Sequence, residues 1–259
     1  MRIALKIEIT GRRGAAEGVP ALLGILRRQR ARATFVAGAR HFDGLKAAAD
    51  AGLETGLLAT DTRPWPLRLA EDKPEAYERR LTAAIADYRA ALGTAPALHA
   101  ATDWRGGPHG LRLTQRLGFA CASDARGRHP FLPVWNGEIV RCPQIPTTLP
   151  TLRDVVRPGM SSEAVCDALL ELTLPPAPTG QVFALDAGDM TPTRHDLLES
   201  LLTGWREQGH ELTSVRSLAE SFDMDKLPRH EVTVGTMPGC RAPVLLQGEE
   251  FLSDWRHPA

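Results

Sequence analysis

The sequence lacks the cysteine and serine patterns of several common site chemistries. Its four cysteines, Cys121, Cys142, Cys166 and Cys240, lie far apart, with no CxxC pair. This spacing argues against a redox or structural-metal motif and predicts reduced, structural cysteines. A serine nucleophile of the GxSxG type is absent as well, so the motif of the α/β-hydrolases is excluded.

Paired histidines are also missing. The eight histidines stand singly, and none has another histidine three or four residues away, which is the spacing that brings two imidazoles to one zinc ion on a helix. His99 lies inside the apolar stretch 97–101, where a hydrogen-bonded core histidine is favoured over a metal ligand. The sequence therefore indicates no histidine-based zinc site.

Net charge and long apolar runs are absent too. The formal net charge is zero with 24% charged residues, so no basic surface for DNA or RNA is predicted. The first eight residues reach a charge too early for a signal-peptide core, and no apolar run approaches the length of a membrane span. With 43% hydrophobic residues, these features predict an ordinary globular protein of the cytoplasm.

What the chain does have is a repeated alternation of strand and helix patterns. A strand is expected at 2–9, ended by the glycines at 11 and 14, and a helix at 19–30 carries aliphatic residues at helical spacing. The same order then recurs. Further strands are expected at 33–37, 55–59, 97–101, 119–123, 181–185 and 211–213, and further helices at 43–51, 74–92, 108–117, 161–174, 193–208 and 215–222.

This alternation predicts a parallel sheet, because parallel neighbours need a crossover connection and a helix is the usual one. Seven such units, with no glycine-rich phosphate loop after the first strand, favour a (β/α) barrel over a dinucleotide-binding fold. We expect an α/β protein with one barrel domain over 1–226. A proline-punctuated excursion at 130–150 contains a strand at 138–142, and residues 227–259, without clear periodicity, form a tail that packs on the barrel or is partly mobile.

In such a barrel the carboxyl ends of all strands point toward one mouth, so the residues just beyond the strands meet there. Most of these residues carry a charge or a hydrogen-bonding group. They are Glu8 and Thr10, Asp61, Asp103 with Trp104 and Arg105, Asp124 with Arg126, and Asp186 with Asp189. The sequence therefore predicts an acidic mouth that also contains two guanidinium groups.

Several of these side chains have a structural interpretation as well. Asp61 lies shortly before a proline and Asp189 before a helix, so both suit helix caps, while Asp103 could simply pair with Arg105. Glu8 is harder to explain by structure alone. A strand buried on both faces rarely ends in a carboxylate unless that group is paired or takes part in chemistry.

Four stretches of the chain resemble one known family. They are GAAEGVPALLGIL at 14–26, the pair Trp104-Arg105, SDARG at 123–127 and QIPTTLPT at 144–151. Across about 3–222 the sequence resembles the NodB-homology polysaccharide deacetylases, and within them the deformylases of undecaprenyl-phosphate-linked 4-deoxy-4-formamido-arabinose. The resemblance implies a distorted seven-stranded (β/α) barrel with its site at the mouth.

The resemblance also implies a metal site, and here the sequence departs from the family. Family members hold a divalent ion with one aspartate and two histidines. Carried over to this chain, the aspartate becomes Thr10 and the histidines become Leu58 and Thr62. Without those donors no bound ion would lower the pKa of a water molecule, so we expect no metal, no other cofactor, and little or no metal-assisted hydrolysis.

The acid–base positions are altered less. The family's general base corresponds to Glu8, one methylene longer than the usual aspartate, and its general acid corresponds to Asp186. Arg105 remains where the family's arginine holds the base. If the chain is active, these three residues would carry a deformylase or deacetylase reaction on a non-peptide C–N bond.

The hypothesis favoured by the sequence is a metal-free pseudoenzyme that binds an amino sugar or an undecaprenyl-phosphate-linked sugar, or that modulates an active enzyme. Carboxylates suit a free amine through charge-assisted hydrogen bonds, and a tryptophan suits a sugar ring. The expected substrate-binding residues are Asp61, Asp103, Trp104, Asp124 and Arg126. A lipid-linked ligand would add peripheral contact with the inner membrane.

Three alternatives remain open from the sequence. Glu8, Asp61 and Asp186 could form an acid–base set for a metal-independent hydrolase. The same three carboxylates could hold magnesium in an all-oxygen site. Finally, the mouth could be vestigial in a structural or partner-binding protein, with the apolar residues of the tail, 244–246 and 251–252, docked on a sister subunit or a membrane.

Overall fold

The computed structural model describes residues 1–10, 15–59, 74–237, 240 and 242–252. The main sheet is seven-stranded and its described pairings are parallel, with the order β5-β4-β3-β2-β1-β8 and β9 also paired with β1. The expected seven-stranded α/β fold is confirmed. The strands are β1 (Arg2–Ile9), β2 (Thr34–Ala37), β3 (Glu54–Ala59), β4 (Leu98–Ala101), β5 (Cys121–Ala122), β8 (Gln181–Asp186) and β9 (Glu211–Thr213).

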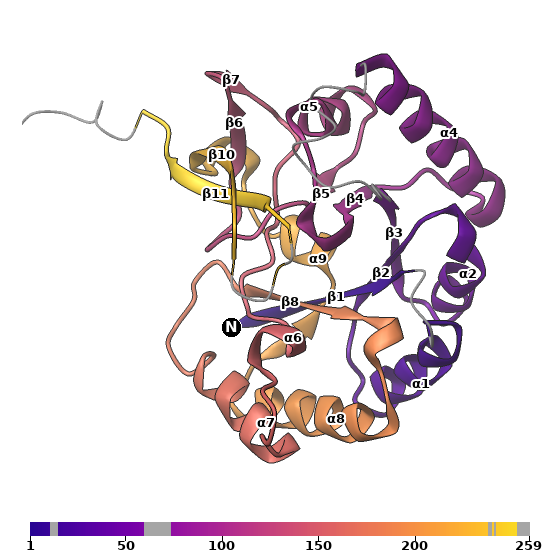
Figure 1. The fold of residues 1–259 in the computed structure, drawn as a ribbon, viewed down its shortest axis with the longest axis vertical. Coiled ribbons are helices and arrows are strands. Elements are labelled where there is room, and N and C mark those ends of the chain that lie inside the picture. Colours follow the sequence, from indigo (N-terminus) through magenta and orange to yellow (C-terminus); the bar gives the residue numbers. More distant parts are fainter. Residues whose placement is uncertain (11–14, 60–73, 238–239, 241, 253–259) are drawn as a thin grey trace, which may run out of the picture.

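Helices cover the outside of this curled sheet (Figure 1). They are α1 (Ala15–Arg28), α2 (Phe42–Asp50), α4 (Pro74–Leu92), α5 (Pro108–Arg116), α7 (Ser162–Glu171) and α8 (Pro192–Glu207). The short α9 (Val215–Ala219) instead packs Val215 and Leu218 into the apolar cluster that holds Ala4 and Val182, and so helps to fill the barrel interior. No helix in the described part of the chain is long and apolar enough to cross a membrane.

Successive side chains of strand β1 point alternately to the helix-covered face of the sheet and to the barrel interior. Its odd-numbered residues, such as Leu5 and Ile7, belong to the large apolar cluster shared with the helices, while Ala4 belongs to the interior cluster. Lys6 and Glu8 therefore face the interior of the barrel. Both side chains are buried, at 0% and 6% relative exposure.

The gap between the edge strands β5 and β8 is closed by the irregular segment 143–149. The Ile145 amide donates to Ala122 O on β5 at 2.7 Å, and the Leu149 amide donates to Val182 O on β8 at 3.1 Å. The Thr148 hydroxyl accepts a further hydrogen bond from the Val182 amide at 2.9 Å. The QIPTTLPT stretch thus completes the barrel wall, a role that its prolines do not suggest.

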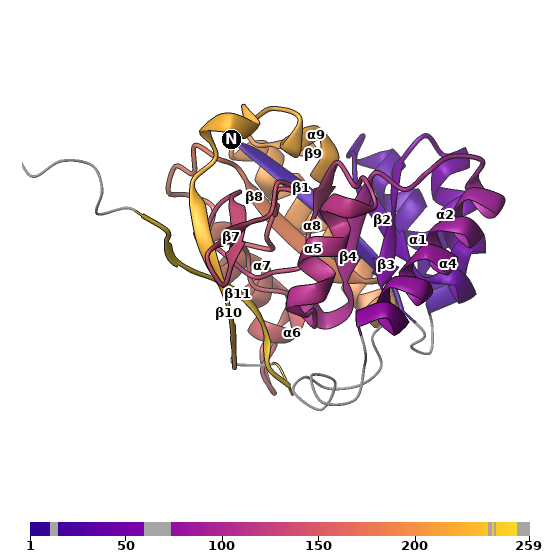
Figure 2. The same ribbon diagram turned by 90° about the horizontal axis from the view of Figure 1, so that it is seen from above.

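A second sheet forms where the sequence showed no periodicity. Strands β10 (Arg229–Gly235) and β11 (Val244–Glu250) pair antiparallel and join β6 (Leu132–Trp135) and β7 (Glu138–Ile139) in the order β11-β10-β6-β7. Two views place this hairpin on the side of the barrel away from α2 and α4 (Figures 1 and 2). Because Val244 lines the mouth cavity, residues after 226 contribute to the site, and they form two strands that the sequence pattern did not indicate.

Other element boundaries also differ from the sequence expectation. The strand expected at 119–123 is shortened to β5. The Phe119 amide donates to Thr114 O in the turn after α5, and the Ala120 amide donates to Ala97 O, just before β4. Helix α7 ends at Glu171 rather than 174. The strand expected at 138–142 is the two-residue β7, and β6 was not foreseen.

Helix α1 packs tightly against the segment that follows β8. A Cβ atom added to Gly18 would lie 2.1 Å from the carbonyl oxygen of Ala187, which is backbone and cannot rotate away. We expect Gly18→Ala to lower the free energy of unfolding by about 1–3 kcal/mol through overpacking and to shift the loop that holds Asp186. Urea unfolding would measure the loss. Gly24→Ala, where the nearest atom is the mobile Arg28 side chain at 3.5 Å, is the matched control and should be neutral or slightly stabilising.

Candidate functional site at the barrel mouth

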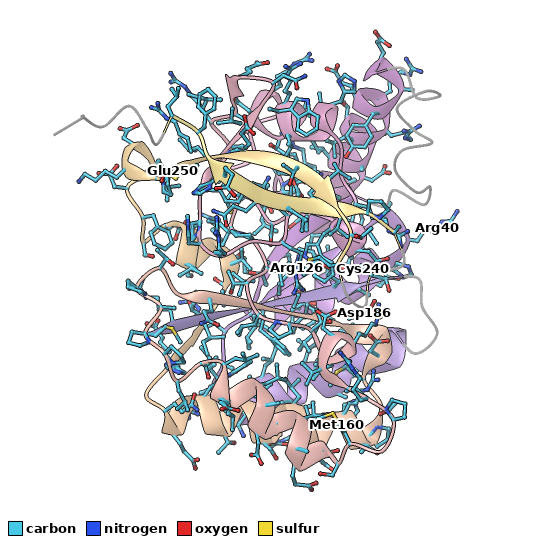
Figure 3. The ribbon with its side chains drawn as sticks, turned by 60° about the vertical axis from the view of Figure 1, so that its left-hand side comes forward. Arg40, Arg126, Met160, Asp186, Cys240 and Glu250 are labelled. Atoms are coloured by element: carbon cyan, nitrogen blue, oxygen red, sulfur yellow. The ribbon has the colours of Figure 1, made fainter. Side chains whose placement is uncertain are left out.

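A cavity of about 470 Å³ opens at the carboxyl ends of β1 and β8 and is walled on one side by β11. Figure 3 shows Asp186, Cys240 and Arg126 close together below the β10–β11 hairpin. Among the described residues, five carboxylates and two guanidinium groups line the cavity, namely Glu8, Asp103, Asp154, Asp186 and Asp189, and Arg105 and Arg153. Most of these residues were predicted at the mouth from the sequence, whereas Arg153 and Asp154 were not.

Glu8 lies at the inner end of this cavity beside a buried cation. Lys6 Nζ is 3.2 Å from Glu8 Oε1 and donates to the Ser123 carbonyl at 3.2 Å. Burial raises the pKa of Glu8, and the nearby Lys6 opposes but does not cancel that shift. Lys6, like Glu8, is a charged residue in a strand buried on both faces, so the same sequence signal that marks Glu8 also marks Lys6.

Trp104 is a buried scaffold for two cations. Its indole is 8% exposed, with Lys6 Nζ 5.4 Å and Arg126 Cζ 4.7 Å from the ring centroid. Its Nε1 donates to Thr147 Oγ1 at 2.9 Å. Asp103 and Trp104 have φ values of 51° and 56°, a left-handed conformation that non-glycine residues hold only when their surroundings enforce it. The indole ring therefore packs against the cations of Lys6 and Arg126. Arg126 itself is not part of the cavity lining.

Asp186 at the end of β8 is fully engaged within the chain. Its Oδ2 accepts from Thr10 Oγ1 at 2.8 Å, and its Oδ1 accepts from the Gly188 amide at 2.8 Å. Arg153 Nη2 is 3.3 Å from Oδ2. These three donors hold the carboxylate in place through charge-assisted hydrogen bonds, an arrangement that suits a structural or binding role.

Two other residues expected at the mouth lie elsewhere. Leu58 is 1% exposed and packs with Val36 and Ala100 in the interior apolar cluster. Asp124 is 2% exposed, with Oδ1 2.7 Å from His99 Nδ1 and Oδ2 accepting from Gln144 at 3.1 Å. Asp124 therefore does not line the cavity, and the prediction that His99 is a hydrogen-bonded core residue is confirmed.

The remaining expected residues fall outside the described part. Asp61 and Thr62 lie within 60–73, which the structure does not describe. Among the described residues no group of three or more His, Cys, Asp or Glu side chains is arranged to hold a metal ion. All four cysteines are free thiols, and burial raises the pKa of Cys142 to about 12, so that thiol stays protonated and inert near neutral pH.

Several known proteins are similar to this chain in sequence or in fold. No family model matches the chain. Over 112 residues it is 32% identical to a Shewanella sediminis protein named 4-deoxy-4-formamido-L-arabinose-phosphoundecaprenol deformylase ArnD. That match covers 43% of this chain and 35% of the relative, so the chain is matched to about a third of that protein's length.

Solved structures extend the likeness to almost the whole chain. A Mycobacterium smegmatis protein assigned to the polysaccharide deacetylases superposes with a TM-score of 0.65 at 17% identity, covering 91% of this chain and 95% of that one. BA3943 of Bacillus anthracis, described as a CE4 family pseudoenzyme, gives 0.60 at 15% identity over 89% of this chain and 69% of that one. The chain therefore has the fold of the polysaccharide deacetylases, and part of its sequence is similar to a protein named as an ArnD deformylase.

Proposed function

We propose that this chain is a non-hydrolysing relative of the polysaccharide deacetylases that binds a sugar in the cavity at the barrel mouth. One observation carries the proposal. At two positions where the resemblance implies metal ligands, Thr10 uses its hydroxyl as a donor to Asp186 and Leu58 is an aliphatic side chain in an apolar cluster. Neither side chain supplies the carboxylate, imidazole or thiolate donor that zinc takes in proteins. Thr62, at the third position, lies outside the described residues.

The relatives support both halves of the proposal. The Shewanella protein is named for a sugar linked to phosphoundecaprenol, and the Bacillus anthracis protein is described as a pseudoenzyme. A sugar substrate and a loss of hydrolysis thus both occur in the names of similar proteins. If the ligand of this chain is lipid-linked, the protein would work as a peripheral protein at the cytoplasmic face of the inner membrane, by itself or beside an active enzyme.

Metal analysis combined with a sugar titration tests this function. Purified protein should contain only substoichiometric metal and release neither formate nor acetate from N-formyl or N-acetyl sugars, with or without added zinc. Ligand-detected NMR should show N-acetylglucosamine binding that Asp186→Ala and Asp103→Ala weaken about tenfold, the value of one charge-assisted hydrogen bond. Asp167→Ala, an exposed position on α7, is the control. A stoichiometric metal together with deacylation would contradict the proposal.

One observation favours a second candidate, a metal-independent hydrolase. Burial raises the pKa of Glu8, and a shift in this direction favours the use of a carboxyl group as a general acid or base. Hydrolysis of an N-acylated sugar that persists with a chelator and is abolished by Glu8→Gln would establish this candidate in place of the first.

A further inference from the structure

Every described carboxylate that lines the cavity already has a cationic partner within the chain. Each of the five lies within 4.0 Å of a lysine or arginine nitrogen, and these partners equal the acids in number. The pairs are Glu8 with Lys6, Asp103 with Arg105, Asp154 with Arg126, Asp186 with Arg153, and Asp189 with Arg153 and Arg194. Among the residues that the structure describes, the carboxylates of the cavity are therefore matched by cations of the same chain.

Arg153 is the centre of this arrangement. Its Nε donates to Asp189, its Nη2 is 3.3 Å from Asp186 Oδ2, and its Nη1 is 3.9 Å from Asp103 Oδ1. These three carboxylates come from two segments, after β4 and at the end of β8, that are far apart in the chain. One guanidinium therefore contacts the three acids that a bound cation would also contact.

The backbone holds Arg153 in this position. It lies in the first turn of α6 (Leu152–Val155), where Thr151 and Asp154 form a capping box. Asp154 Oδ2 accepts from the Thr151 amide at 2.8 Å and is also 3.4 Å from Arg126 Nη1. The start of α6 is thus anchored on both sides, and the guanidinium stays in the cavity with about a third of its side chain, 34%, exposed.

We propose that Arg153 is the residue that decides which ligands the mouth accepts: it occupies the position of a cationic ligand, so the cavity takes a neutral sugar rather than a free amine or a metal ion. An ammonium group could reach these carboxylates only by displacing the guanidinium and losing its charge-assisted hydrogen bonds. A neutral sugar can use the remaining lone pairs without doing so. The preference for a neutral sugar rests on the proposed function, whereas the exclusion of cations by Arg153 does not.

Titration of two matched sugars tests the proposal. Glucosamine carries a charged amine near neutral pH, and N-acetylglucosamine is its neutral counterpart. We expect the wild type to bind N-acetylglucosamine at least about tenfold more tightly, and Arg153→Met to gain about tenfold or more for glucosamine alone, the equivalent of one charge-assisted hydrogen bond. Arg153→Lys keeps a cation and should retain the exclusion. Arg157→Met, an exposed arginine just after α6, should change neither affinity.

The outcomes separate the two proposals. Tighter binding of glucosamine than of N-acetylglucosamine by the wild type overturns the inference, and this comparison needs no variant. A folded Arg153→Met protein, checked by circular dichroism, that gains nothing for glucosamine also overturns it. If the wild type binds neither sugar but Arg153→Met binds glucosamine, Arg153 does exclude cations and the sugar-binding function is the part that fails.

Discussion

A variant that combines Thr10→Asp, Leu58→His and Thr62→His should bind one zinc ion per chain, where the wild type binds none. The three changes supply the carboxylate and imidazole donors that zinc prefers. Without metal the variant should be less stable than the wild type by several kcal/mol. Leu58→His brings an imidazole into an apolar cluster, at a cost of about 1–3 kcal/mol for an unsatisfied polar group. Thr10→Asp places a second carboxylate beside Asp186, whose Oδ2 is now 2.8 Å from the Thr10 hydroxyl.

Zinc should then recover that loss, because a ligand that binds only the folded state adds about 4 kcal/mol at a thousandfold excess over its dissociation constant. Thermal unfolding with and without zinc, together with metal analysis, measures both effects. Leu58→His alone is the control and should lose stability without gaining a zinc response. If equimolar zinc raises the unfolding temperature of the wild type as much as that of the triple variant, the idea that the native site lacks metal ligands is wrong.

Replacing Lys6 by methionine should lower the free energy of unfolding by about 3–5 kcal/mol near neutral pH, the usual cost of removing one partner of a buried ion pair. Lys6 and Glu8 are 0% and 6% exposed and 3.2 Å apart, so the change leaves the carboxylate buried without its cation. Lys46→Met is the matched control. Lys46 is half-exposed and 3.7 Å from Asp43, and its loss should stay within about 0.5 kcal/mol.

The cost of Lys6→Met should also depend on pH. Burial raises the pKa of Glu8 in the folded protein, and removing Lys6 takes away the charge that opposes this shift. A carboxyl group whose pKa is raised by folding contributes stability that is present below its unfolded pKa and lost as the pH rises through the folded value. The deficit of the variant should therefore be small below about pH 4, the unfolded pKa of glutamate, and grow toward neutral pH.

Urea unfolding across that pH range measures this dependence, and the double variant Lys6→Met with Glu8→Gln should recover most of the neutral-pH loss because no buried charge remains. A deficit that is constant with pH would mean that Lys6 acts through packing against Trp104 alone. An equal loss for Lys6→Met and Lys46→Met would mean that the buried pair contributes no more than a surface charge.

Local patterns in the sequence were enough to predict the barrel and some of the residues at its mouth. The switch between strand and helix spacing is a property of neighbouring residues, and so is the position of Glu8, Asp103 and Asp186 at or just after the carboxyl ends of strands. Where the pattern was weak, the prediction failed. Strand β10 alternates between exposed and buried residues only over the five residues 229–233, and β11 is buried only at Val244 and Leu245. Such short patterns predict no sheet by themselves, and the pairing of the two strands depends on contact with β6 and with the backbone of Arg126.

The sequence by itself determined the fold class, the acidic composition of the mouth and the threonine and leucine at positions where the resemblance implies metal ligands. Only the tertiary structure decided how those acids are used. Arg153 contacts Asp186 although the two residues are 33 positions apart in the chain. The segment 143–149 closes the barrel wall through backbone hydrogen bonds, which a pattern of side chains cannot predict. Charge balance is a property of distances in space, so carboxylates that by sequence suggest a site for a cation, such as Glu8, Asp103 and Asp186, are paired instead with cations of the same chain.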